Sequence, residues 1–353
     1  MQPKMIDTRF YNQKPLTPKP TSRTSTLTTF SSPRGNPLDL IQPDMQRVDL
    51  VISERLTTEV PLVREVAQYI ISAGGKRLRP ALLLLMSGAL EDHHAHRHTL
   101  AAVVEFIHTA TLLHDDVVDE STLRRGRETA NERFGNAASV LVGDFLYSRA
   151  FQMMVDVNNM RVMQVLSDAT NVIAEGEVLQ LMNMRDASLS EMDYLRVIRS
   201  KTAKLFEASA RLAPILAGAN AQTEVICATY GQALGTAFQV IDDVLDYEGK
   251  AEELGKNLGD DLREGKVTLP IICALKTGSE PQKQLIRNAI EQGDVAHLDD
   301  ILTIILETGA LEQARASAMA EAQRAADAAQ QLPVNAYSVA LLQLAAGLMG
   351  RRS

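Results

Sequence analysis

The chain has 353 residues, which is enough for one large domain or two ordinary ones with a sizeable core. Its formal net charge of −8 argues against bulk nucleic-acid binding, and its apolar content of 45% is normal for a globular protein. The sequence has no uninterrupted apolar run of about 18 residues, so it predicts no membrane span. Two cysteines, Cys227 and Cys273, are too few for a disulfide framework and fit a reducing compartment.

Residues 1–36 differ in composition from the rest of the chain. They are rich in Pro, Ser and Thr, they are basic, and Asp7 is the only acid before Asp39. This composition predicts a disordered tail, and it also suits an organellar transit peptide. An apolar segment of the secretory kind is absent. We prefer the disordered tail of a cytoplasmic protein.

Residues 37–353 show a helical pattern almost throughout. Apolar residues recur at intervals of three and four, as in Val103, Phe106, Ile107, Ala110 and Leu113. No convincing alternation predicts a strand. Turn-forming residues gather at 72–80, 91–98, 123–129 and 247–266, and Pro80 is expected to begin a helix. The sequence therefore predicts one all-α domain of roughly ten or more helices.

An acidic cluster lies in the segment LLHDDVVDESTLRRG, residues 112–126. On a helix, Asp115, Asp116 and Asp119 fall within an arc of about 100°. Like charges on one face repel each other, so something must compensate them. A hard divalent cation such as Mg²⁺, shared with substrate phosphates, would do so, and a solvated acidic face is the alternative.

The segment FQVIDDVLD repeats this spacing with Asp242, Asp243 and Asp246. Both clusters lie among Val, Ile and Leu, whereas a solvated face would be rich in lysine and glutamate. Two copies in this setting favour metal binding over a solvated face. The alternate acids and glycine of a helix–loop–helix calcium site are absent.

Basic residues that could bind phosphate gather near the predicted turns. Arginine binds phosphate through a planar fork, and lysine acts as a point charge. Two glycines beside the first group would let backbone N–H groups approach an anion. Each cation alone has the properties of a surface residue, but together with the acidic motifs they predict two diphosphates in one site. The cations are Lys76, Arg77 and Arg79; Arg124 and Arg125, expected at the end of the helix that bears Asp119; Lys201, beside Thr202; and Lys256 and Lys266.

The chain resembles the trans (E-type) polyprenyl diphosphate synthases, especially the long-chain members. The motifs that carry the resemblance are GGKRLRP, LLHDDVVDESTLRRG, GDFLYSRAF, KTAKLF, FQVIDDVLDY and GKNLGDDLREGKVTLP, in the family's order over about residues 48–350. The resemblance implies a single large helical bundle of the isoprenoid synthase type with a central cavity.

The resemblance also implies roles for individual residues. The six aspartates of the two motifs, together with Lys201, would be catalytic, and the aspartates would hold two or three Mg²⁺ ions. Isopentenyl diphosphate would contact Lys76, Arg79, His108 and Arg125. The allylic diphosphate would contact Arg124, Lys201, Thr202, Gln239, Lys256 and Lys266. No distinct role follows for Arg77, Asp260 or Asp261.

The implied activity is condensation of an allylic diphosphate, farnesyl or similar, with successive isopentenyl diphosphate units. The implied product is long, with octaprenyl diphosphate for a quinone side chain expected. The resemblance also implies a homodimer, with membrane proximity for product release.

The resemblance also implies which residues limit product length. In short-chain members of the family, aromatic residues just before the first aspartate motif block the cavity, and this chain has small residues at those positions. These are Thr111 and Ala110, four and five residues before Asp115, and Met154 or Met153 is expected deeper as a floor. On the second motif's helix, Gly231 and Gly235 predict either close packing or cavity space.

Three alternatives remain. A short-chain farnesyl or geranylgeranyl diphosphate synthase uses the same chemistry, but the small residues before Asp115 disfavour it. A class I terpene cyclase usually lacks the second aspartate motif and GGKRLRP. A non-catalytic subunit of a heteromeric synthase is disfavoured because both motifs are intact.

Overall fold

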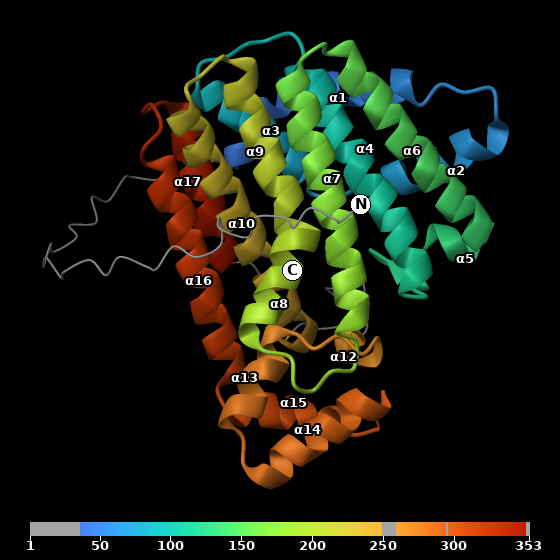
Figure 1. Cartoon of the computed structure of the whole chain (residues 1–353), viewed down its shortest axis with the longest axis vertical. Coiled ribbons are helices and arrows are strands. Elements are labelled where there is room, and N and C mark those ends of the chain that lie inside the picture. The colour runs from blue at the N-terminus through green and yellow to red at the C-terminus, as the bar shows by residue number, and fades with distance from the viewer. Residues whose placement is uncertain (1–35, 249–258, 294–295, 351–353) are drawn as a thin grey trace, which may run out of the picture. The chain divides into compact units, whose positions relative to one another are not determined.

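The computed structural model describes residues 36–248, 259–293 and 296–350. Nearly all of this part is helical, as Figure 1 shows, and the prediction of an all-α fold is confirmed. Residues 1–35 of the predicted tail lie outside the described residues, so the division at residue 36 stays a prediction. Among the described residues, no helix is both long and apolar enough to cross a membrane.

The first half of the described part contains eight helices and helical turns. They are η1 (Pro37–Ile41), α1 (Gln42–Arg55), α2 (Pro61–Ser72), α3 (Leu78–Ala89), α4 (Arg97–Val118), α5 (Ala130–Phe134), α6 (Asn136–Asp156) and α7 (Met160–Met182). In the second half, α8 (Glu191–Ile198), the π-helical turn η2 (Arg199–Ala203) and α9 (Lys204–Leu216) form one continuous run. They are followed by α10 (Ala221–Glu248), α12 (Asp260–Arg263), α13 (Leu269–Thr277), α14 (Glu280–Gln292), α15 (Leu298–Glu307), α16 (Ala310–Ala329) and α17 (Ala336–Met349).

A small β-hairpin follows α4 and was not predicted. Strand β1 (Leu123–Arg124) pairs with β2 (Arg127–Glu128), and these are the strands of the described part. The two residues of the turn, Arg125 and Gly126, have φ values of 55° and 73°. Positive φ at both positions is the pattern of the tight turn that matches strand twist. The expectation that Arg124 and Arg125 end the helix of Asp119 is therefore wrong, because α4 ends at Val118.

The expectation that Pro80 begins a helix is also wrong, by two residues. Helix α3 starts at Leu78, so Pro80 is its third residue. Proline is tolerated there because the first N–H groups of a helix have no acceptor within the helix.

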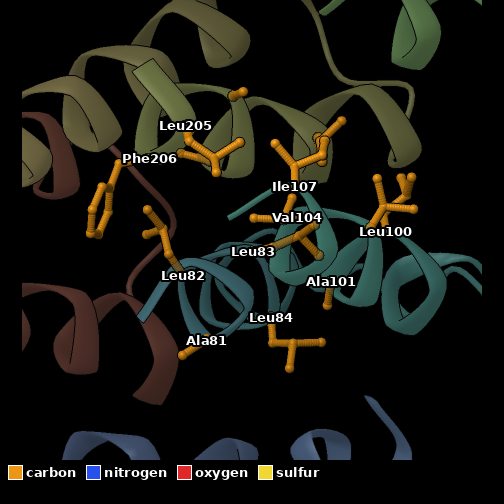
Figure 2. Close-up of a cluster of buried hydrophobic side chains, with 14 of the residues drawn as sticks. Ala81, Leu82, Leu83, Leu84, Leu100, Ala101, Val104, Ile107, Leu205 and Phe206 are labelled. Carbon is orange, nitrogen blue, oxygen red and sulfur yellow. The ribbon is translucent and has the colours of Figure 1, made fainter. Parts of the chain in front are cut away.

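Two hydrophobic clusters stabilise the described part. The larger one joins α1–α4, α6, α7 and α9 with the first half of α10, the end of α16 and α17. Figure 2 shows its centre, where Leu82 and Leu83 of α3, Val104 and Ile107 of α4, and Leu205 of α9 lie together. The smaller cluster joins the end of α10 to α8 and α12–α16. The two aspartate motifs thus end helices that are embedded in apolar packing.

Helix α10 packs against α9 and α16 at close range. A side chain at Gly231 would place its Cβ 2.5 Å from the carbonyl oxygen of Phe206, and one at Gly235 would approach Cα of Ala203 at 2.7 Å. Of the two reasons considered for these glycines, close packing is therefore the one that the structure supports.

Candidate active site

The first aspartate motif lies at the end of α4. Asp115 and Asp116 belong to its last turn, and Asp119 is its C-cap residue. Asp116 is fully buried, and its Oδ1 accepts hydrogen bonds from Nε and Nη2 of Arg124 at 2.9 and 2.7 Å. Burial lowers the pKa of Arg124, but its hydrogen bond and ion pair with Asp116 outweigh burial, so the net pKa is raised. The hairpin therefore places a permanent positive charge beside the motif.

Lys201 lies on the other side of Asp115. Its Nζ is 2.6 Å from Glu177 Oε2 on α7 and 3.7 Å from Asp115 Oδ1. Burial raises the pKa of Asp115, and burial together with the charge of Asp115 raises the pKa of Glu177 to about 7. Lys201 thus carries its charge between two partly buried acids.

Lys266 lies between Asp119 and a second acid, as Lys201 lies between Asp115 and Glu177. Its Nζ donates to Asp119 Oδ2 at 2.8 Å and to Glu264 Oε2 at 2.5 Å. Burial lowers the pKa of Lys266, but the charges of Asp119 and Glu264 outweigh it, and the net pKa is raised well above its usual value. Both lysines are therefore cationic and lie beside the first motif.

The second motif lies near the end of α10, where Asp243 and Asp246 are buried. Asp243 accepts from the hydroxyl of Tyr194 at 2.6 Å and from the amide of Gln239 at 2.7 Å. Burial raises the pKa of Asp243 to about 8, the charge of Asp261 adds to this rise, and the two hydrogen bonds oppose it. Two donors thus hold one carboxylate of the motif in place.

One chain of contacts links the two motifs through η2. Gln239, which donates to Asp243, accepts from the hydroxyl of Thr202 at 2.9 Å. The residue directly before Thr202 is Lys201, which lies beside Asp115. The π-helical turn fits closely against α7, because a side chain at Gly176 would place its Cβ 2.8 Å from the backbone nitrogen of Lys201.

A second link runs through α12. The backbone N–H of Asp261 donates to Asp246 Oδ2 at 3.3 Å, and the N–H of Lys266 donates to the carbonyl of Asp261 at 2.8 Å. The side chain of Lys266 then reaches Asp119. Asp261, for which the sequence predicted no role, therefore connects the second motif to Lys266, whose side chain contacts the first motif.

A separate cationic cluster lies around His108 on α4. Arg79 Nη1 donates to His108 Nε2 at 3.1 Å, and the guanidinium of Arg79 lies 4.5 Å from the ring centre of Phe206. Burial and the charges of Arg79, Arg124 and Arg125 keep the pKa of His108 well below its ordinary value. The imidazole is therefore neutral and accepts at Nε2, since a guanidinium can only donate.

Arg125 reaches this cluster from the hairpin and lies against Gly75. A side chain at Gly75 would place its Cβ 2.6 Å from Arg125 Nη1, and the φ of Gly75 is 151°. Lys76 follows on the exposed turn before α3. The structure brings together Arg124, Lys201, Thr202, Gln239 and Lys266 around the two motifs, and Arg79, His108 and Arg125 in the second cluster, whereas Lys256 lies outside the described residues.

The sequence pattern of the polyprenyl synthetase family matches residues 60–305. The chain belongs to the polyprenyl synthetase family. It is 52% identical to octaprenyl diphosphate synthase of Escherichia coli (strain K12) over 308 residues, which cover 87% of this chain and 95% of that protein. It is 44% identical to all-trans-nonaprenyl-diphosphate synthase (geranyl-diphosphate specific) of Rhodobacter capsulatus, over 87% and 95% of the two chains.

The fold matches solved structures of the polyprenyl synthetase family. A polyprenyl synthase from Caulobacter crescentus CB15, complexed with calcium and isoprenyl diphosphate, has a TM-score of 0.87 and 42% identity, over 91% of this chain and all of that one. The resemblance, the helical fold of the isoprenoid synthase type and the assignment as a prenyl-transferring enzyme are thus confirmed.

The residues of the two motifs fit a metal ion shared with a substrate. Among the described residues, no three His, Cys, Asp or Glu side chains converge as a closed metal cage. Mg²⁺ usually takes one or two carboxylates and completes its shell with water and phosphate oxygens. The motifs offer hard carboxylate oxygens, and the buried Oδ2 of Asp116 has no hydrogen-bond partner. This donor set suits a divalent cation that binds together with a diphosphate.

The expected chain-length residues all lie on α4 and α6, which pack against each other. Ala110 and Met154 are fully buried, whereas Thr111 is half-buried and its hydroxyl donates to the carbonyl of His108 at 2.8 Å. Their role in product length stays a prediction.

Three residues that contact the candidate site were not predicted: Tyr194, Glu177 and Glu264. Each lies outside the two aspartate motifs, and each is an ordinary residue for a helix or a loop. Tyr194 and Glu177 have partners far along the chain, 49 positions away for Tyr194 and Asp243, whereas Glu264 pairs with Lys266 two positions away in a loop. A single sequence carries no local signal for the distant pairs.

Proposed function

We propose that the protein is a trans-prenyltransferase that adds successive isopentenyl units to an allylic diphosphate and makes octaprenyl diphosphate. One observation carries the proposal. Two carboxylate motifs, linked through η2 and α12, lie beside Arg124, Lys201 and Lys266, and a separate cationic cluster surrounds His108. Two sets of cations suit two diphosphates.

The allylic diphosphate would bind at the first set. Lys201 and Lys266 already carry positive charge, so they would exchange their present acid partners for phosphate oxygens. Arg124, Thr202 and Gln239 would add hydrogen bonds, and Lys256 is proposed to join them. Mg²⁺, two or three ions held by the six aspartates, would neutralise the charge that develops on the leaving pyrophosphate.

Isopentenyl diphosphate would bind at the second set, which is formed by Lys76, Arg79, His108 and Arg125. The bond from the allylic carbon to the pyrophosphate oxygen would break first and leave an allylic cation, which the double bond of isopentenyl diphosphate would then attack. The freed pyrophosphate would accept the proton lost from the adjacent carbon, and the new trans double bond would form. The reaction needs no side-chain nucleophile, and apolar walls would exclude water from the allylic cation.

An octaprenyl product is supported by the relative of that name at 52% identity and by the small residues Ala110 and Thr111. Incubation with farnesyl diphosphate, radiolabelled isopentenyl diphosphate and Mg²⁺ tests it. The expected product after dephosphorylation is the eight-unit alcohol.

The same incubation separates the alternatives. Products that stop at three or four units would identify a short-chain synthase, and a cyclic hydrocarbon without uptake of label would identify a terpene cyclase. Product formation only after addition of a second polypeptide would identify a subunit of a heteromeric synthase.

A homodimer is proposed as well. Its support is a set of exposed apolar side chains on α6 and α7, in which Leu141 is 66% exposed, Met160 81% and Met182 75%. Light scattering should give twice the chain mass of 38.6 kDa, and a monomer at micromolar concentration would contradict the proposal. A cytoplasmic location, release of product near a membrane and supply of a quinone side chain complete the proposal.

A further inference from the structure

Glu105 lies on α4, three residues before His108, and its side chain is 13% exposed. It faces arginines from separate segments of the chain. Arg77 Nε lies 3.8 Å from its Oε1. Burial raises the pKa of Glu105, and the charges of Arg77, Arg79 and Arg125 oppose this rise and favour the carboxylate. One acid thus stands among the cations of the proposed isopentenyl diphosphate site.

Arg79 is partly buried, whereas Arg125 is exposed, and the charges of neighbouring groups act on both. Burial and the neighbouring charge of Arg124 lower the pKa of Arg125, and the charge of Glu105 opposes this. Burial likewise lowers the pKa of Arg79 to about 10, against the charges of Glu105 and Asp242. Because His108 is neutral, it cannot add to or offset these charges. Glu105 is therefore a counter-charge common to Arg79 and Arg125.

Two polar atoms of this cluster are buried without a hydrogen-bond partner: Oε2 of Glu105 and Nε of Arg79. Buried polar atoms without partners are uncommon, and each requires an explanation. Arg79 is held on its other sides by His108 and by the ring of Phe206. The guanidinium of Arg79 is therefore held in place and keeps one donor, Nε, for an anion, whereas Oε2 of Glu105 can only accept.

We propose that Glu105 is a positioning residue that holds Arg79 and Arg125 ready for the diphosphate of isopentenyl diphosphate. The inference rests on the proposed function and deepens it. Without a carboxylate, the guanidinium groups would repel one another and move apart when the substrate is absent. With it, they stay aimed at one place, so less ordering is needed on binding. The benefit of fixed donors exceeds the repulsion between the carboxylate and the anion.

The test is Glu105→Gln, which keeps the shape and removes the charge. Calorimetric titration with isopentenyl diphosphate alone, which cannot react without an allylic partner, should show a Kd raised by about tenfold or more. The KM for isopentenyl diphosphate should rise similarly, while the KM for farnesyl diphosphate stays within about twofold. Glu105→Asp keeps the charge on a shorter side chain and should fall between wild type and Glu105→Gln.

Glu207→Gln is a matched control. Glu207 is also 13% exposed, and it pairs with Lys204 at 2.9 Å and Arg211 at 3.3 Å on α9. This variant should lose stability without a change in either KM. The wild-type protein, assayed in parallel, must form prenyl product, and its failure would contradict the proposed function and not the role of Glu105.

Folded Glu105→Gln that binds isopentenyl diphosphate as tightly as wild type, or more tightly, would overturn the inference, because the acid would then only repel the anion. An equal rise of both KM values in Glu105→Gln and in Glu207→Gln would also overturn it. If Glu105→Gln does not fold, the folded Glu105→Asp variant decides: a raised KM for isopentenyl diphosphate alone supports the inference, and wild-type values overturn it.

Discussion

Replacing Tyr194 with phenylalanine would remove one buried hydroxyl group from the second aspartate motif. The Tyr194 side chain is nearly inaccessible, with 3% exposure, and its hydroxyl donates to Asp243 Oδ2 at 2.6 Å. Gln239 would remain as the other donor to this carboxyl group. The change therefore tests how far a residue outside the motif supports it.

The expected loss of stability depends on pH. Burial raises the pKa of Asp243 from 3.8 to about 8, so folding stability falls as pH rises between these values. The Tyr194 hydrogen bond opposes this rise, so its removal moves the pKa of Asp243 higher and extends the fall above pH 8. At pH 6, where Asp243 is protonated, we expect a loss of about 1 kcal/mol, the usual value for a neutral hydrogen bond. At pH 9 the loss should approach about 1.5–3 kcal/mol, as for a bond to a charged group.

Guanidinium unfolding at pH 6 and pH 9 measures this difference. Calorimetric titration with Mg²⁺ and inorganic pyrophosphate should show binding weakened by about tenfold, the equivalent of about 1.4 kcal/mol. Tyr230→Phe is the matched control, because the hydroxyl of Tyr230 is buried and donates at 2.7 Å to the neutral carbonyl of Leu341. It should lose about 1 kcal/mol at both pH values and keep its affinity for pyrophosphate. Equal losses in the two variants at both pH values, with pyrophosphate affinity unchanged, would refute the reasoning.

Three further predictions concern residues of the candidate site. Asp115→Asn and Asp242→Asn should each lower turnover by orders of magnitude while circular dichroism shows an intact fold, and wild-type turnover in both would contradict the two-motif mechanism. Arg79→Ala should chiefly raise the KM for isopentenyl diphosphate, and Lys201→Ala should chiefly lower turnover or raise the KM for the allylic substrate; steady-state kinetics showing the reverse would mean that the two sites are exchanged. Thr111→Phe should shorten the product with early condensation retained, because a half-buried position on α4 has room for a ring only at the expense of the growing chain; chromatography that finds the wild-type length would remove Thr111 from the path of the chain.

The helices and the acidic faces follow from local sequence. The i, i+1, i+4 spacing places Asp115, Asp116 and Asp119 on one face wherever the chain is helical, because the helical repeat fixes their directions. The apolar period around them requires that this helix be buried on its other sides. The second motif, at Asp242, Asp243 and Asp246, has the same spacing and lies in a similar apolar pattern.

The hairpin after α4 could not be predicted in this way. Its strands have two residues each, too few to show alternation, and Arg125 adopts a positive φ that arginine seldom takes. Arg124 ends strand β1 and Arg125 is the first residue of the turn, so the first binds Asp116 while the second lies against Gly75. The sequence identified both cations but not their directions.

The sequence by itself determined the helical fold, the two aspartate faces and the kinds of residue available to bind phosphate, because these depend on spacing along one helix and on side-chain chemistry. The tertiary structure decided which acid holds which cation. Glu177 holds Lys201 and Glu264 holds Lys266, and Glu105 stands among the arginines while Tyr194 supports Asp243. Most of these partners come from different helices, so their distances and pKa values arise only when the helices pack together.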